Sequence, residues 1–490
     1  MNTDVHAGID APLEAKAPAK AEGAPTMVSI LKMAAPFAIT IAIWLVPVPA
    51  GLTAPAWHLF AIFVSAIIAV LLGAFPLLTS TMLAAAAVVL TGTLEPAKAF
   101  AGFANPTVLL VVVAFLVAQA VVKCGLGRRI SLAMVSRFGA SPRGLAYSIV
   151  LTDAVLAPAF PSNTARGGVL FPVVLAVAQG AGSRPDDPKG RRLGGYLMFC
   201  AMASLAVSSA LWMTATSGNP IGVQITHDFG LDVNFGKWIA VSCVPSLVAI
   251  LLLPRVLEKL YPHGVEATKE APAKAKADLS SMGPLTRDEW ITAIAFAFMV
   301  GGWIFATPLH LNVTIIAFAG LGVLLMTNVL TMKDISQQGD TLATFLWLAV
   351  LFALSGQLNE LGFMTYAGQR LAAQLGGLSW PVTFATLIVL YVAVHYLFVS
   401  QSSQILALLA VFMDVGVRGG VPAPLMGFSL LFASSYFSVI TPQGGSQNII
   451  FAASGYLTQR ELYKLGFFVT LAFMAVFLLI GTPWVYFVTR

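Results

Sequence analysis

The sequence predicts an all-α polytopic membrane protein built from an inverted repeat, and three observations carry that prediction. Hydrophobic residues make up 58% of the 490 residues, charged residues only 10%, and the mean hydropathy is +0.86, which excludes a soluble globular chain. Apolar runs of about 18 to 20 residues, the length that spans a bilayer as a helix, recur along the chain. Polar patches interrupt the longest runs at corresponding places in the two halves.

Composition and charge divide the chain into four parts. Residues 1–27 are rich in Ala, Pro, Lys and Glu without an apolar core, which predicts a disordered cytoplasmic tail. Residues 28–255 form the first part, 256–288 a basic cytoplasmic linker, and 289–490 the second part. Assigning the basic clusters to the cytoplasmic side places the N-terminus there. The pI of about 9.2 then reflects loops that face anionic lipid, so we expect no nucleic-acid partner.

Two long apolar stretches, 145–182 and 380–417, are each expected to enter and leave the membrane by the same face. Basic clusters that count as cytoplasmic lie on both sides of 145–182, which predicts a hairpin with its turn near Ser162. The second stretch is broken near its middle by the polar residues 400–404. Since the first hairpin enters from the cytoplasm and the second from the opposite side, the two halves describe an inverted repeat.

Two further polar patches lie inside apolar segments of spanning length, "TATSGNPIG" at 214–222 and "TPQGGSQN" at 441–448. Gly and Pro there break the helix, and the free helix ends attract anions at their amides and cations at their carbonyls. A single patch of this kind often only joins helices to one another. Four patches in symmetric positions favour a midplane cavity that holds a carboxylate.

Arg166 is the sharpest single residue, because a guanidinium near the bilayer centre costs at least about 2.5 kcal/mol and needs a partner. It is predicted either to clamp a substrate carboxylate or to pair with Asp153. Asp153 and Asp414 are candidates for proton relay or for internal ion pairs. His395 is expected to be a hydrogen-bonded packing group, with substrate contact as the alternative.

Enzyme and metal signatures are missing from the sequence. It contains no P-loop, no His-Glu-x-x-His and no Gly-x-Ser-x-Gly motif. Cys124, Cys200 and Cys243 are dispersed and match no metal or disulfide spacing, so we interpret them as packing residues. The sequence therefore predicts a transport protein without a cofactor.

At "PSNTARGG", "WMTATSGNP" and "HYLFVSQSSQ" the chain resembles the divalent anion:sodium symporter family over about residues 28 to 490. Within that family it is similar to the bacterial citrate/succinate and tartrate/succinate antiporters and the plastid 2-oxoglutarate/malate translocators. The resemblance implies a homodimer with roughly eleven transmembrane helices and two re-entrant hairpins, working as an elevator-type transporter. It also implies dicarboxylate substrates, lipid as the surrounding partner, and the bacterial cytoplasmic (inner) membrane as the location.

Family members bind substrate carboxylates at the two hairpin tips and the two unwound segments. Carried over by position, the implied substrate-binding residues are Ser162, Asn163 and Thr164 in the first tip with Ser217, Gly218 and Asn219 facing them, and Ser400, Gln401 and Ser402 in the second tip with Thr441, Pro442 and Gly444 opposite.

The second tip departs from the symporter pattern, because it reads Ser-Gln-Ser where the symporters carry Ser-Asn-Thr. The segment "TPQGGSQN" also lacks the symporters' Gly-Thr-Pro-Pro-Asn. Both departures favour exchange of one dicarboxylate for another, with no cation required. The alternative is a sodium-coupled symporter, in which Asn163 and Gly218 hold one sodium ion and Ser400 with Thr441 a poorer second one.

Two rivals come from other functional classes. A cavity lined by hydroxyls and helix ends could conduct anions as a channel. An intramembrane enzyme would use Ser162 or Ser400 as its nucleophile, but the sequence offers no base with an orienting partner. Di- and tricarboxylates, tartrate and sulfate are all compatible with a site made of hydroxyls and amides.

Overall fold

The computed structural model describes residues 27–490 apart from 189, 375–377 and 399, and all regular elements of these residues are helices. Almost all of the expected N-terminal tail, 1–27, lies outside the described residues. The helices of the first half and the linker are α1 Met27–Leu45, α2 Ala54–Leu71, α3 Leu77–Leu90, α4 Pro96–Ala99, α5 Pro106–Lys123, α6 Leu126–Phe138, α7 Pro142–Leu156, α8 Asn163–Gly180, α9 Arg191–Leu211, α10 Gly218–His227, α11 Phe235–Leu260 and α12 Glu270–Ser281.

The second half carries the remaining helices. They are α13 Arg287–Ile304, α14 Val313–Met326, α15 Met332–Ser336, α16 Gly339–Glu360, α17 Phe363–Gln374, α18 Trp380–His395, α19 Gln401–Arg418, α20 Ala423–Tyr436, α21 Ser446–Ala452, α22 Gln459–Val476 and α23 Thr482–Thr489. Polar caps set several of the starts. Asn105 and Asn312 each accept two backbone N–H groups at the beginning of α5 and α14, and Thr286 with Glu289 forms a capping box at α13.

Seven helices of the described residues are long and apolar enough to cross a membrane: α1, α2, α5, α9, α11, α16 and the continuous segment Gln459–Thr489. The helices α3, α14 and α18 are apolar but shorter. In α1 only Pro36 is buried, whereas in α9 every residue from Leu193 to Leu211 is buried. The chain is therefore an all-helical membrane protein with α9 at its centre.

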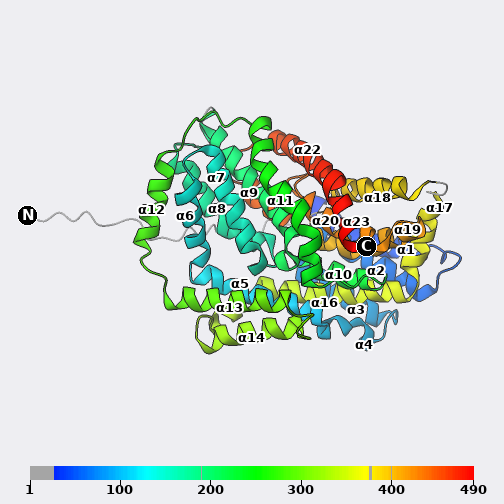
Figure 1. The fold of residues 1–490 in the computed structure, drawn as a ribbon. Coiled ribbons are helices and arrows are strands. Elements are labelled where there is room, and N and C mark those ends of the chain that lie inside the picture. The colour runs from blue at the N-terminus through cyan, green and yellow to red at the C-terminus, as the bar shows by residue number, and fades with distance from the viewer. Residues whose placement is uncertain (1–26, 189, 375–377, 399) are drawn as a thin grey trace, which may run out of the picture.

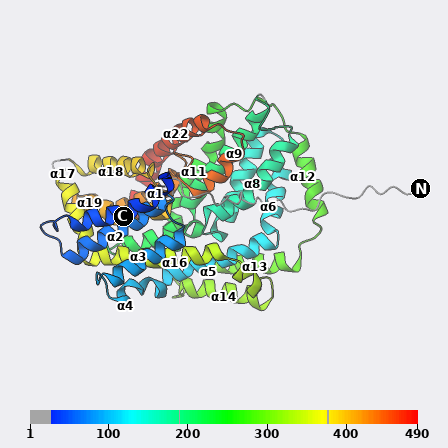
Figure 2. The ribbon, with the colours of Figure 1, turned by 180° about the vertical axis from the view of Figure 1, so that it is seen from behind.

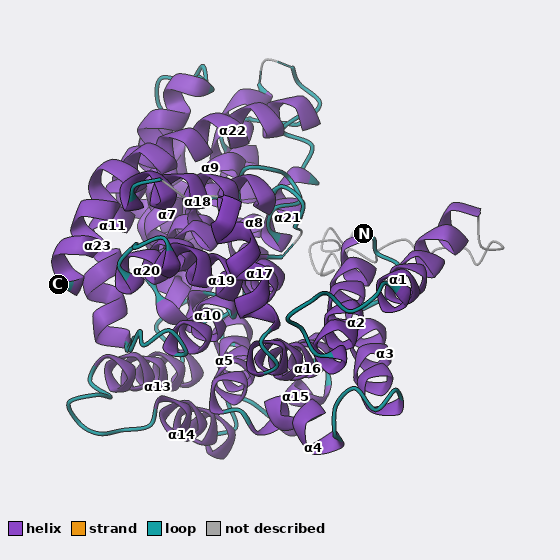
Figure 3. Cartoon of the chain, turned by 90° about the vertical axis from the view of Figure 1, so that its right-hand side faces the viewer, coloured by secondary structure: helices purple, strands orange, loops and turns teal. Residues whose placement is uncertain are grey.

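The helices form two groups, and in Figure 3 the second of them runs along the bottom and the right of the first. The central group, α7–α11 with α18–α23, surrounds α9, which packs against α7, α8, α11 and α20. The outer group, α2–α5 with α13–α16, runs along one edge of the molecule in Figure 1. Seen from behind in Figure 2, α2, α3 and α16 lie side by side, and the three pack against one another.

The same order of elements occurs in both halves of the chain. An amphipathic helix, α6 or α17, leads to a pair of helices joined by a short tip, α7–α8 or α18–α19. A long segment with a break then follows, α9–α10 in the first half and α20–α21 in the second. The breaks, between Leu211 and Gly218 and between Tyr436 and Ser446, fall at the two patches where the sequence predicted them.

The ion pairs between helices join helices of the same group or involve the connecting helix α6. Lys123–Asp334 lies within the outer group, Arg143–Glu258 and Arg191–Glu461 lie within the central group, and Arg129–Glu289 ties the connecting helix α6 to α13. The side chains of Lys123 and Thr331 hydrogen-bond to Asp334 and lower its pKa to about 2, so this pair persists at neutral pH. None of the ion pairs found among the described residues joins the outer group to the central group.

Candidate functional site

The two tips begin in the same way. Ser162 and Ser400 are N-caps in extended conformation, and their hydroxyls accept the backbone N–H of Ala165 at 3.2 Å and of Ser403 at 3.4 Å. Each serine satisfies one of the amides that a helix start leaves free. The helices α8 and α19 thus present their positive ends at Asn163 and Gln401, inside the protein.

Each break is braced by an asparagine at the same spacing. Asn219 Nδ2 donates to the carbonyls ten and seven residues earlier, Ser209 at 2.7 Å and Trp212 at 3.2 Å. Asn448 Nδ2 donates to Ser438 at 2.9 Å and Thr441 at 3.0 Å, again ten and seven residues earlier. These bonds hold the carbonyls that the interrupted helices release.

The tip of each half meets the broken segment of the other half. The hydroxyls of Ser402 and Ser217 lie 2.9 Å apart, and Thr164 Oγ1 donates to Ser446 Oγ at 2.6 Å. The tips also contact each other, because Asn163 Nδ2 donates to Gln401 Oε1 at 2.8 Å. Four segments that lie far apart in the sequence therefore converge at one place.

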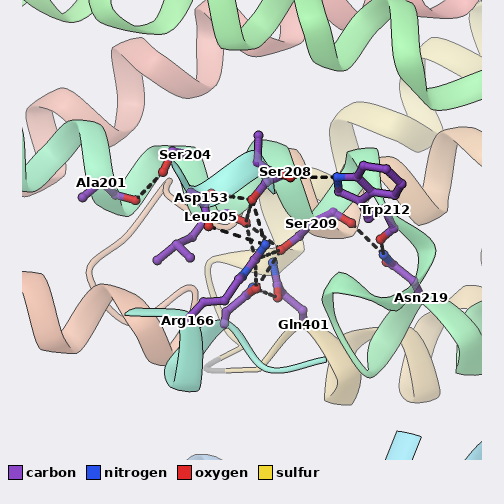
Figure 4. A network of polar contacts seen from close by, with 12 residues as sticks. Asp153, Arg166, Ala201, Ser204, Leu205, Ser208, Ser209, Trp212, Asn219 and Gln401 are labelled. Atoms are coloured by element: carbon purple, nitrogen blue, oxygen red, sulfur yellow. Dashed lines mark hydrogen bonds and ion pairs between the residues drawn. The ribbon is translucent and has the colours of Figure 1, made fainter. Parts of the chain in front are cut away.

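Arg166 lies behind the first tip, with only 1% of its surface exposed. Its guanidinium donates to Asn163 Oδ1, to the hydroxyls of Ser208 at 2.9 Å and Ser209 at 2.8 Å, and to the Leu205 carbonyl at 3.1 Å. Figure 4 shows it pointing at Ser208 and Ser209 of α9, with Gln401 beside it.

Asp153 completes this network. Its carboxylate lies 3.6 Å from Arg166 Nη1 and accepts the Ser208 hydroxyl, and it is fully buried. Asp153 and Arg166 thus form one of the two pairings that the sequence left open for the arginine. A buried pair of this kind needs extra hydrogen bonds to offset desolvation, and Ser208, Ser209 and Asn163 supply them.

His395 occupies the corresponding place behind the second tip. Its Nδ1 faces Gln404 Oε1 and its Nε2 lies 2.7 Å from the Gly444 carbonyl, so both ring nitrogens face hydrogen-bond acceptors. Gln404 in turn donates to the Tyr391 carbonyl at 2.8 Å. His395 is buried and hydrogen-bonded, as expected of a packing group. Asp414, the other candidate for proton relay, pairs with Arg418 at 2.7 Å on its own helix.

The structure brings most of the predicted site residues together. Gly218 lies against the second tip, because a methyl group there would approach Ser402 Oγ to 3.3 Å. Thr441 and Gly444 lie in the second break. The Thr441 carbonyl accepts a hydrogen bond from Asn448, and the Gly444 carbonyl is hydrogen-bonded to His395. Pro442 lies in the same break but has no hydrogen-bonding side chain.

Sequence reasoning missed Ser446, Gln447 and Asn448, which the structure places opposite the first tip. A signal was present, because Ser217-Gly-Asn219 and Ser446-Gln-Asn448 share the pattern Ser-x-Asn. The partners of Arg166 on α9, Ser208 and Ser209, carried no comparable signal.

Of the sixteen buried polar atoms that lack a hydrogen-bond partner among the described residues, six lie at the tips and in the broken segments. They are Asn219 Oδ1, Gln401 Nε2, Thr441 Oγ1, Asn448 Oδ1 and both amide atoms of Gln447. Buried polar atoms are almost always paired in native proteins. The convergence point therefore offers donors and acceptors to a polar ligand.

The largest cavity described, about 740 Å³, lies along a different face of α8. It is lined by Ala165, Val169, Pro172 and Val173 of that helix and by residues of α5, α6 and α12. Its walls are mainly apolar, so it does not match the polar convergence point.

Known proteins are similar to this sequence along almost its whole length. The family described as "Sodium:sulfate symporter transmembrane region" matches residues 27–489. A Bacillus subtilis protein named "Putative malate transporter YflS" is 36% identical over 95% of this chain and 98% of its own length. The spinach "Dicarboxylate transporter 1, chloroplastic" is 34% identical over 93% and 81%. The Escherichia coli "Citrate/succinate antiporter" is 30% identical over 93% and 98%.

The fold also has a solved counterpart. The crystal structure of the Alcanivorax borkumensis YdaH transporter matches with a TM-score of 0.56 at 16% identity, covering 95% of this chain and 99% of that one. At this identity the match concerns the fold alone. Together these findings show that the chain belongs to the sodium:sulfate symporter family, the divalent anion:sodium symporters that the tip motif resembles, which are transporters and not enzymes.

Proposed function

We propose that the protein is a secondary transporter that exchanges C4 and C5 dicarboxylates of the 2-oxoglutarate, malate and succinate type. The observation that carries this proposal is the convergence of two tips and two broken helices around unpartnered buried donors and acceptors. The positive ends of α8 and α19 attract carboxylates without exposing a charged side chain. Malate, dicarboxylate and citrate/succinate transport in the relatives supports the same substrate class.

Exchange without sodium is supported by the groups behind each tip. A sodium ion needs free oxygen ligands, yet Asn163 Oδ1 accepts from both Arg166 and Ser209, and the Gly444 carbonyl accepts from His395. At the first tip the fixed charge of Arg166 stands near where a coupling cation would sit. In an empty carrier of this design the Arg166 guanidinium, paired with Asp153, occupies the place of a coupling cation.

The membrane topology that we propose is based on the two groups of helices. About eleven transmembrane helices accompany two re-entrant hairpins, 145–182 and 380–417, in an inverted repeat of residues 28–255 and 289–490. The protein lies in the inner membrane of a bacterial cell, with the linker 256–288 and the N-terminus on the cytoplasmic side. The unpaired apolar surface of the outer group, including Ile294, Phe298 and Ile315, suits lipid or a second copy in a homodimer.

An elevator mechanism fits the distribution of contacts. The central group carries both tips and both broken helices, and ion pairs stay within each group. Sparse hydrogen bonds cross between them, such as Thr107 to Gln224 at 3.4 Å and Ser355 to the Leu406 carbonyl at 3.2 Å. We infer that the central group moves as a body along the outer group and takes the substrate with it.

Sodium-coupled symport is the second candidate, and one observation favours it. Asn219 Oδ1, Thr441 Oγ1 and Asn448 Oδ1 are buried oxygens without partners among the described residues, and a sodium ion prefers such ligands. In that case the cation sites would lie at the breaks rather than at the tip amides.

Transport by purified protein in proteoliposomes separates these candidates. Uptake of labelled succinate or 2-oxoglutarate is measured while the internal dicarboxylate and the external sodium are varied independently. We expect uptake that requires internal dicarboxylate and ignores sodium. Uptake into empty vesicles driven by a sodium gradient would establish the symporter instead, and flux that never saturates would indicate a channel.

The tip is tested by Asn163→Ala, with the exposed Gln179→Ala on the same helix as a matched control. Asn163 joins Arg166, Ser209 and the second tip, so its loss should abolish exchange while leaving the oligomeric state unchanged. The control should exchange at the wild-type rate. Normal exchange by purified Asn163→Ala would remove the first tip from the site.

A further inference from the structure

We propose that Gln447 is a specificity-determining residue that selects 2-hydroxydicarboxylates over their unsubstituted analogues. The proposal rests on the dicarboxylate exchange proposed above and adds a residue and a substrate class to it.

Gln447 lies where the second break meets the first tip. It is the second residue of α21, next to Ser446, whose hydroxyl accepts from Thr164 of the tip. A methyl group at Gly167 of α8 would lie 3.5 Å from its Cβ, so the residue packs against the hairpin helix just beyond Arg166. The side chain is 0% exposed.

The amide of Gln447 folds back over the start of α21. A methyl group at Gly445 would lie 2.5 Å from Nε2 and 2.6 Å from Oε1, which places the amide over the break. Neither amide atom has a hydrogen-bond partner among the described residues. A buried amide with both ends unpaired is costly unless a ligand or water meets it.

The first half of the molecule has no such group. Gly218 holds the position equivalent to Gln447, between Ser217 and the bracing Asn219, and there the second hairpin fills the space with Ile405. A methyl group at Gly218 would approach Ile405 Cδ1 to 2.8 Å. In the second half the sizes are reversed, with Gly167 on the hairpin and Gln447 on the broken helix. The two ends of a bound dicarboxylate therefore meet different chemistry.

The donors and acceptors that a substrate offers to the Gln447 amide indicate the substrate class. A carboxylate is an acceptor only, so it satisfies Nε2 and leaves Oε1 unpaired. A hydroxyl beside that carboxylate donates to Oε1, so a 2-hydroxydicarboxylate satisfies both atoms at once. A site whose buried polar groups need a substrate hydroxyl discriminates against the analogue that lacks it.

The test uses the full-length protein in proteoliposomes loaded with succinate. Exchange of labelled succinate is inhibited by unlabelled succinate or by each enantiomer of 2-hydroxysuccinate, and the ratio of half-inhibitory concentrations is the readout. For wild-type protein we expect one enantiomer to inhibit at a concentration about tenfold below that of succinate, the size of discrimination that a neutral hydrogen-bond pair gives.

Gln447→Met keeps the length of the side chain and removes both hydrogen-bonding atoms, and Gln447→Asn keeps the amide one carbon shorter. Gln447→Met should weaken succinate exchange without abolishing it, because Nε2 no longer donates to the carboxylate, and should reduce the inhibition ratio to about one. Gln447→Asn should give an intermediate ratio. The exposed Gln179→Met is the matched control and should keep the wild-type ratio.

Each outcome decides the proposal. A wild-type ratio near one for both enantiomers, or a tenfold preference that survives in Gln447→Met, overturns it while dicarboxylate exchange stands. Loss of succinate exchange in both variants also overturns it, because Gln447 would then be a structural residue. Absence of any dicarboxylate exchange in the wild-type protein overturns the proposed function and this inference together.

Discussion

The two tips share one framework but differ in the groups that hold it. Both have a serine cap, a hydroxyl pair with the opposite break, and an asparagine that braces the break at the same spacing. Behind the first tip stands the buried ion pair of Arg166 and Asp153. Behind the second stands His395, hydrogen-bonded to Gln404 and Gly444, with no ion pair to any residue that the structure describes.

This difference separates two requirements that one site has to meet. The shared framework fixes the backbone of four helix ends, which any oxyanion can use. The groups that differ set polarity and selectivity, because a buried ion pair holds the first tip beside Asn163 whereas hydrogen bonds alone hold the second tip. A transporter can therefore change its coupling or its substrate without changing the framework.

Arg166→Met should have the largest effect on stability. It leaves the Asp153 carboxylate buried without its charge partner, and breaking a buried pair from one side costs about 3–5 kcal/mol. We expect a large fall in the thermal unfolding midpoint of the detergent-purified protein and no measurable exchange.

The double variant Asp153→Asn with Arg166→Met sharpens this prediction. It removes both charges, so most of the lost stability should return, while exchange stays absent because Asn163 is no longer held. If the double variant is no more stable than Arg166→Met, the buried charge of Asp153 is not the cause of the loss.

The two bracing asparagines test the shared part of the framework. Asn219→Ala and Asn448→Ala each remove two hydrogen bonds to buried carbonyls, which should cost roughly 2–3 kcal/mol in each case. We expect unfolding midpoints that fall by similar amounts. A large fall for one variant and none for the other would mean that the equal spacings do not reflect equal roles.

His395→Gln addresses the second tip of the comparison. Glutamine can keep one of the two hydrogen bonds, so stability should fall by only about 1–2 kcal/mol. Exchange should slow more than stability suggests, because the Gly444 carbonyl in the break loses its donor. Stimulation of the residual exchange by external sodium would support the idea that His395 occupies a place open to a cation.

The fold was predictable because its causes are local and repeated. Apolar runs define the helices, and the Gly and Pro residues at 214–222 and 441–448 interrupt them where the structure does. The resemblance implied a division of the elevator type, but which helices belong to the outer and which to the central group was not predictable, because that depends on which apolar face packs on which. Composition is similar on lipid-facing and protein-facing sides of such helices.

The candidate site was predictable only in part. The Ser-Asn-Thr tip could be recognised from the sequence, because polar residues inside a membrane-spanning apolar stretch are costly and therefore indicate a functional site. The partners of Arg166 on α9 could not be found, because Ser208 and Ser209 lie in a run of small residues that reads as ordinary helix packing. Gln447 was hidden for a different reason, since its contact with Gly167 joins two segments that lie far apart in the sequence.

The hydroxyl pairs should show the smallest effect and the finest contrast. Thr164→Val and Ser402→Ala each remove one hydrogen bond between a tip and the opposite break. Thr164 and Ser446 are exposed, so water can replace the lost partner and stability should hardly change, whereas Ser402 is buried and its loss should cost about 1 kcal/mol. Unfolding midpoints measured side by side decide this, and a larger fall for Thr164→Val would mean that the first tip is closed to water as the second one is.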